Sequence, residues 1–201
     1  MRKHAVAYLI YAQLCFFFFL TIAIFITTAG FQNNHGLSFY GEHWDTAVPF
    51  GAGFIFCDYF LLRAANVLPK SKPPFKTISK LINILTVLLL FILLTPDTLN
   101  SFFDWSHIVD SSILFAFELS FAGWLTFVWY RDNVIWLLLS LQFIAAILAM
   151  LSQFHVIYYL SEGILFFQMF FGLLLIRSVS KLLSKVAHPE QDKQTPLIKV
   201  E

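Results

Sequence analysis

Residues 78–96, ISKLINILTVLLLFILLTP, form an almost unbroken apolar run that ends at a proline. A helix needs roughly 20 predominantly apolar residues to cross the hydrocarbon core of a bilayer. Runs of similar length recur along the rest of the chain, separated by short polar segments. The sequence therefore predicts six membrane-spanning helices, at about residues 5–29, 48–67, 80–96, 108–129, 134–153 and 157–178.

The composition supports a membrane protein. Among the 201 residues, 59% are hydrophobic and only 12% are charged, whereas a soluble domain carries about 25% charged residues. The apolar runs are continuous and lack the alternating pattern of membrane β-barrel strands. We predict an all-α, polytopic membrane protein in which a six-helix bundle occupies residues 1–183 and a polar tail, expected to be disordered, occupies residues 184–201.

The positions of lysine and arginine predict the orientation of the bundle. If the N-terminus is cytoplasmic, all 13 basic residues fall on the inner side and none falls in the three outer loops. This distribution follows the positive-inside rule and predicts that both termini are cytoplasmic. The first apolar run is longer than the core of a signal peptide, which has about 7–15 residues, so we expect it to remain as a helix. The net charge of +1 provides no basic surface for nucleic acid.

The longest polar interruption in the first third of the chain is NNHGLSFYGEHWDTAVPF, at residues 33–50. The predicted orientation places it at the outer face, where acids and histidines collect and basic residues are absent. Within it, two glycines bracket the apolar and aromatic residues of GLSFYG, and glycine permits tight changes of direction. We expect this loop to be ordered and to pack over the bundle as a lid.

Six residues of the outer loops are candidates for a ligand-binding site: His35, Tyr40, His43, Asp45, His107 and Asp110. Histidine and carboxylate side chains suit zinc or another transition metal. His107 and Asp110 are three positions apart and share one face of a helix, and His43 and Asp45 would join them from the first loop. The sequence contains no established ligand motif such as HExxH, so these spacings support only a weak metal-site hypothesis.

Two other interpretations of the outer polar residues stay open. In the first, Asp104 or Ser106 caps the fourth span, and the neighbouring acids interact with the positive end of its helix dipole. In the second, the outer residues line a polar pocket that binds a ligand other than a metal. The sequence indicates no particular cofactor.

Three carboxylates fall inside predicted spans: Asp58, Glu118 and Glu162. Ionisable residues in the membrane are energetically costly, usually face the interior of the bundle and often mark function. No lysine or arginine is available at their depth, so the neutral form of each acid is favoured. They form either a buried polar core that is reached from the outer loops, with a role in proton binding, or separate neutral acids that hold helices together.

The segment that follows the first span carries a resemblance to a known family. Its GLSFYG motif, with the pattern G-x-S-x-[YF]-G, and the following TAVP, with the pattern T-x-x-P, resemble a family of bacterial six-helix membrane proteins grouped with the Frag/DRAM/Sfk superfamily. The resemblance implies the fold and a multi-pass location in the bacterial cytoplasmic membrane. The resemblance implies no catalytic residues. The acids of the second and fourth spans, Asp58 and Glu118, are a departure from the family pattern.

Three classes of function are compatible with these features. The first is a non-enzymatic membrane protein whose outer pocket binds a lipid, a small solute or a protein partner. The second is a small proton-coupled transporter that uses the buried acids and compensates for its size by forming a homo-oligomer. The third is a metal-dependent intramembrane hydrolase, which requires convergence of His35, His43, His107, Asp110 and Glu118. Since no nucleophile motif is present, the first class is favoured.

Overall fold

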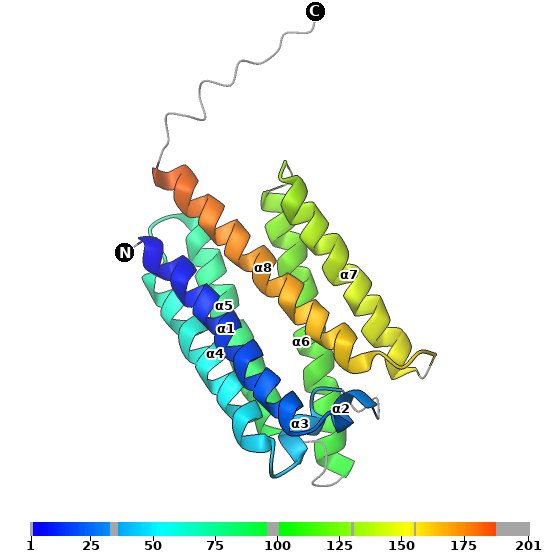
Figure 1. The fold of residues 1–201 in the computed structure, drawn as a ribbon. Coiled ribbons are helices and arrows are strands. Elements are labelled where there is room, and N and C mark those ends of the chain that lie inside the picture. The colour runs from blue at the N-terminus through cyan, green and yellow to red at the C-terminus, as the bar shows by residue number, and fades with distance from the viewer. Residues whose placement is uncertain (1, 33–35, 96–100, 130, 155, 188–201) are drawn as a thin grey trace, which may run out of the picture.

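The computed structural model describes all residues except 1, 33–35, 96–100, 130, 155 and 188–201, and the described part consists of helices joined by turns, without strands (Figure 1). The elements in chain order are α1 (Arg2–Ile26), α2 (Ala29–Gln32), α3 (Phe39–Glu42), α4 (Ala47–Val67), α5 (Pro73–Leu94), α6 (Ser101–Val128), α7 (Asn133–Gln153) and α8 (Leu160–Ala187).

Six of these helices are long and apolar enough to cross a membrane, namely α1, α4, α5, α6, α7 and α8. They lie side by side in one bundle, which confirms the predicted fold class (Figure 1). The start of α1 and the end of α8 lie at the same end of the bundle, which we call the basic end. The short helices α2 and α3 lie at the opposite end, which we call the lid end.

The bundle consists of two groups of three consecutive spans. The first group contains α1, α4 and α5, and its most extensive contact is between α1 and α4. The second group contains α6, α7 and α8, and its most extensive contact is between α7 and α8. The two groups meet where α8 packs against α1 and where α5 packs against α6.

Small residues allow the helices to approach one another closely. The buried positions of α1 recur at intervals of three or four residues and combine small with large side chains: Ala5, Leu9, Ala12, Phe16, Leu20 and Ala23. Gly53 of α4 lies against this side, because a Cβ atom there would be 3.2 Å from Cβ of Phe19. Such small residues at helix contacts are the usual means by which membrane helices gain packing interactions.

Three helix boundaries differ from the prediction for identifiable reasons. Helix α5 begins at Pro73, well before residue 80, because proline is well suited to the first turn of a helix. Helix α6 begins at Ser101, so Asp104 and Ser106 lie inside the helix and the prediction that either one caps it was wrong. Helix α8 continues to Ala187, so the first residues of the predicted tail are helical, and the remainder lies outside the described residues.

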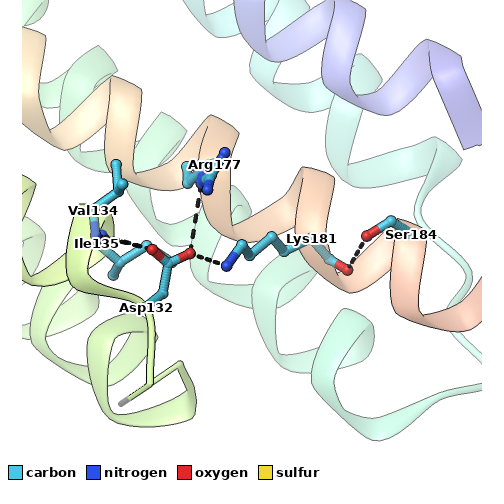
Figure 2. A network of polar contacts seen from close by, with 6 residues as sticks. All are labelled: Asp132, Val134, Ile135, Arg177, Lys181 and Ser184. Carbon is cyan, nitrogen blue, oxygen red and sulfur yellow. Dashed lines mark hydrogen bonds and ion pairs between the residues drawn. The ribbon is translucent and has the colours of Figure 1, made fainter. Parts of the chain in front are cut away.

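At the basic end, Asp132 joins the turn between α6 and α7 to α8 (Figure 2). Its Oδ1 accepts hydrogen bonds from the backbone N–H groups of Val134 and Ile135, which caps α7. Its Oδ2 pairs with Lys181 and lies 3.5 Å from Nε of Arg177. Burial raises the pKa of Asp132, but the hydrogen bonds from Lys181 and from the start of α7 outweigh it and hold the pKa below its ordinary value.

Candidate functional site

The segment GLSFYG closes the lid end, as the sequence predicts. Gly36 has a positive φ of 74°, which favours glycine, and a Cβ atom there would be 3.3 Å from Leu160 at the start of α8. After this turn, Leu37, Phe39 and Tyr40 are buried, and the side chain of Tyr40 is completely inaccessible. The segment is therefore an ordered lid that packs against α8.

Polar residues in the first turn of α8 lie beside α2 and beside the lid. The hydroxyl of Ser161 donates a hydrogen bond to the backbone carbonyl of Gly30 in α2, at 3.1 Å. Tyr40 lies within electrostatic range of Glu162, and burial first and the charge of Glu162 second raise the pKa of Tyr40. Glu162 is thus placed beside the lid, where the positive end of the α8 dipole favours a carboxylate.

A small pocket of about 50 Å³ lies beneath the lid, between the lid and the ends of α5 and α6. Its polar residues are Ser38, Glu42 and His107, and its apolar residues include Phe50, Ile92 and Leu93. Sites for drug-sized molecules enclose about 300–1,000 Å³. The pocket therefore has room for a group of a few atoms, and it joins the lid segment to His107.

The ring of His107 is oriented by the end of α5. Its Nδ1 lies 2.7 Å from the backbone carbonyl of Thr95. A carbonyl only accepts hydrogen bonds, so Nδ1 carries a proton, and in the neutral ring Nε2 is the acceptor. The hydroxyl of Thr95 lies 3.3 Å from Oδ2 of Asp110, so His107 and Asp110 share one helix face and contact the same residue.

The other candidates of the outer loops are placed differently. His43 and Asp45 are exposed and do not line the pocket. The Nδ1 atom of His43 lies 2.8 Å from the carbonyl of Phe39, and its ring is 3.8 Å from the ring of Phe39. Tyr40 is buried within the lid, and His35 lies outside the described residues. In the part of the chain that the structure describes, no three histidine, cysteine, aspartate or glutamate side chains are placed to hold a metal ion.

Two pocket residues, Ser38 and Glu42, were absent from the predicted site. The sequence predicted an ordered loop here without regular structure, whereas Phe39–Glu42 form a helical turn. Positions 38 and 42 are four residues apart and therefore fall on one side of that turn, together with the backbone of Gly41. The signal that would have revealed them is the helical spacing of Ser38 and Glu42 in SFYGE.

The buried acids separate into two locations. Glu118 is 1% exposed at mid-depth in α6, and its Oε2 accepts a hydrogen bond from Nε2 of Gln168 in α8 at 2.7 Å. Asp58 is 4% exposed near the midpoint of α4, and neither carboxyl oxygen has a hydrogen-bond partner among the described residues. Cys57 lies within electrostatic range of both acids. Glu162 is beside the lid instead, about 9 Å along α8 from Gln168 at 1.5 Å per residue, so the three acids do not form one core.

These placements bear on the hydrolase hypothesis. Glu118 lies deep in the bundle, His107 lines the pocket and His43 is exposed, so the described members of the required set do not converge. Comparison with known proteins provides no further assignment, because no family model, no curated protein and no solved structure matches the chain.

Proposed function

We propose that this integral membrane protein binds a small cationic solute in the pocket beneath the lid. The observation that carries the proposal is the convergence of Glu42 from α3 and His107 from α6 on one pocket of about 50 Å³. A location in the bacterial cytoplasmic membrane and membership of the Frag/DRAM/Sfk superfamily remain part of the proposal and rest on the sequence alone.

The chemistry of the lining defines the ligand class. A carboxylate only accepts hydrogen bonds, and His107 presents Nε2 as an acceptor because its Nδ1–H is bonded to Thr95. A ligand that contacts both groups has to donate hydrogen bonds, and a positive charge on it would favour binding beside the carboxylate. Ammonium, or the end of a primary amine, meets these requirements within the available volume, and Phe50 and Leu93 provide an apolar wall for a short alkyl group.

The first prediction concerns methylammonium binding to the detergent-solubilised protein, measured by calorimetry. We expect Glu42→Gln and His107→Ala each to weaken binding by roughly 10- to 100-fold, because a hydrogen bond to a charged group contributes about 1.5–3 kcal/mol. His43→Ala and Asp45→Asn are matched controls at exposed neighbouring positions and should leave the dissociation constant unchanged. Equal losses in the control variants, or no binding by the unsubstituted protein, would contradict the proposal.

A second candidate function, proton-coupled transport, is favoured by one observation. Both oxygens of Asp58 are buried at mid-depth without a partner among the described residues, which is the state of a carboxyl group that is protonated or awaits a ligand. Glu118, in the other group of helices, retains a single amide partner, Gln168. Binding of a proton to Asp58 or Glu118 would change how the two groups of helices pack against each other.

The second prediction tests this candidate in proteoliposomes with an imposed pH gradient and an internal pH-sensitive dye. If the acids carry protons, the unsubstituted protein dissipates the gradient and Asp58→Asn slows dissipation at least about tenfold. Asp110→Asn, at the lid end and outside the pocket lining, is the matched control. A rate that is the same with and without Asp58 would exclude the transport role while leaving the solute pocket untouched.

A further inference from the structure

We propose that two copies of this chain associate in the membrane through the lipid-facing side of α5, with Asn83 of one copy paired with Asn83 of the other. The exposed positions of this side are Lys76, Lys80, Asn83, Val87, Leu90 and Leu94, which we call the α5 stripe. Their spacing alternates between four and three residues, which is the repeat of a seam along which two helices pack.

Asn83 is the feature of the α5 stripe that requires a partner. It stands next to the midpoint of α5, and its side chain is exposed on the outside of the bundle. Its backbone carbonyl accepts a hydrogen bond from Thr86 at 2.8 Å, but its side-chain amide has no partner among the described residues. At this depth the surroundings are hydrocarbon, which can neither donate nor accept hydrogen bonds.

Exposed hydroxyl side chains in the spans avoid this problem within their own helices. The hydroxyls of Thr21, Ser112, Ser120 and Ser140 each donate to the backbone carbonyl four residues earlier, at distances of 2.7–2.9 Å. The amide of Asn83 has both donors and an acceptor and makes no such bond. The contrast indicates that Asn83 is satisfied from outside the chain.

A second copy supplies the matching group at the matching depth. All copies insert with the same orientation, so a two-fold axis along the membrane normal brings α5 of one copy against α5 of the other. Two amides facing each other across this axis each donate one hydrogen bond and accept one. Lys76 and Lys80 repel the same residues of the other copy. The two helices should therefore cross near Asn83 and diverge toward Pro73, where the lysine side chains can reach the membrane–water interface.

The test uses the full chain with Cys15→Ala and Cys57→Ala, so that no native thiol remains. In this background Val87→Cys places a thiol one turn from Asn83, at a residue that is 52% exposed. Ile144→Cys on α7, at a residue that is 54% exposed, is the matched control on another lipid-facing surface. We expect oxidation in proteoliposomes to give a disulfide-linked dimer for Val87→Cys and none for Ile144→Cys.

The role of the amide is then measured by fluorescence energy transfer as the protein is diluted with lipid. Asn83→Leu should weaken dimerisation roughly 5- to 30-fold, as found for polar contacts between membrane helices, and Asn83→Gln should restore it in part. Because position 83 faces lipid, the thermal midpoint of unfolding of Asn83→Leu should not fall, which separates lost association from misfolding. A dimer that Asn83→Leu leaves unchanged, no cross-link at position 87, or a cross-link to a different protein would each overturn the proposal.

Discussion

Gly163→Ala is expected to lower the stability of the bundle by about 1–3 kcal/mol, in the range for overpacked cores. A Cβ atom at position 163 would lie 2.7 Å from the backbone nitrogen and 3.0 Å from Cα of Ala149. Both contacts are with the backbone of α7, so the clash is relieved only if α7 and α8 separate. Helices α7 and α8 form the most extensive contact of their group, so a separation at position 163 should weaken packing along the whole contact between them.

The measurement is thermal unfolding in detergent, where the midpoint for Gly163→Ala should fall by roughly 3–10 °C for a chain of this size. Gly123→Ala is the matched control, because a Cβ atom at that position on α6 would meet nothing within 4 Å. The control should unfold at the same temperature or slightly higher, since alanine favours a helix over glycine by up to about 1 kcal/mol. Similar midpoints for the two variants would show that the close approach of α7 and α8 is not maintained.

Asp132→Ala should destabilise the protein by about 2 kcal/mol. The substitution removes the cap of α7, which contributes about 1 kcal/mol, and both ion pairs to α8. The two ion pairs together contribute only about 1 kcal/mol to the stability, because solvent screens them: the side chains of Arg177 and Lys181 are 45% and 36% exposed. Asp132→Asn retains an oxygen for the cap and loses only the charge, so its destabilisation should be clearly smaller.

The same residue predicts a dependence of stability on pH. Since the folded protein holds the pKa of Asp132 below its ordinary value, its stabilising contribution is complete above the unfolded pKa of about 4 and is lost as the pH falls through the folded pKa. The stability difference between the unsubstituted protein and Asp132→Asn, measured by unfolding at pH 7 and below pH 4, should therefore shrink on acidification. A stability difference that stays constant or grows on acidification would show that the ion pairs of Asp132 do not stabilise the protein.

The six spans could be predicted from the sequence because hydropathy and length alone determine which segments cross a bilayer. Boundaries were harder, since they depend on local chemistry that hydropathy ignores. Pro73 looks like a loop residue but begins α5, and Lys181 lies beyond the predicted end of the last span at residue 178 but belongs to α8, where it pairs with Asp132. Asp132 falls between the fourth and fifth predicted spans, and nothing in the surrounding sequence YRDN (residues 130–133) identifies α8 as the helix that it contacts.

The candidate site was predicted in part. The burial of Asp58 and Glu118 and the ordered lid follow from local sequence, because a carboxylate in a span must avoid lipid and glycine permits the turn. The pocket required knowledge of which loop residue faces His107, and this depends on how α3 is rotated. The neighbouring residues His43 and Asp45 were as plausible as Ser38 and Glu42 until the helical turn was known.

The arrangement of the bundle in two groups of consecutive spans has a consequence for biogenesis. Helices α1, α4 and α5 are synthesised first and contact one another more than they contact the rest, so they can pack before α6 enters the membrane. Contacts between neighbours in the chain require little loop-closure entropy, which favours rapid assembly. The late step is then the docking of α8 against α1, which can take place only after all six of these spans have been made.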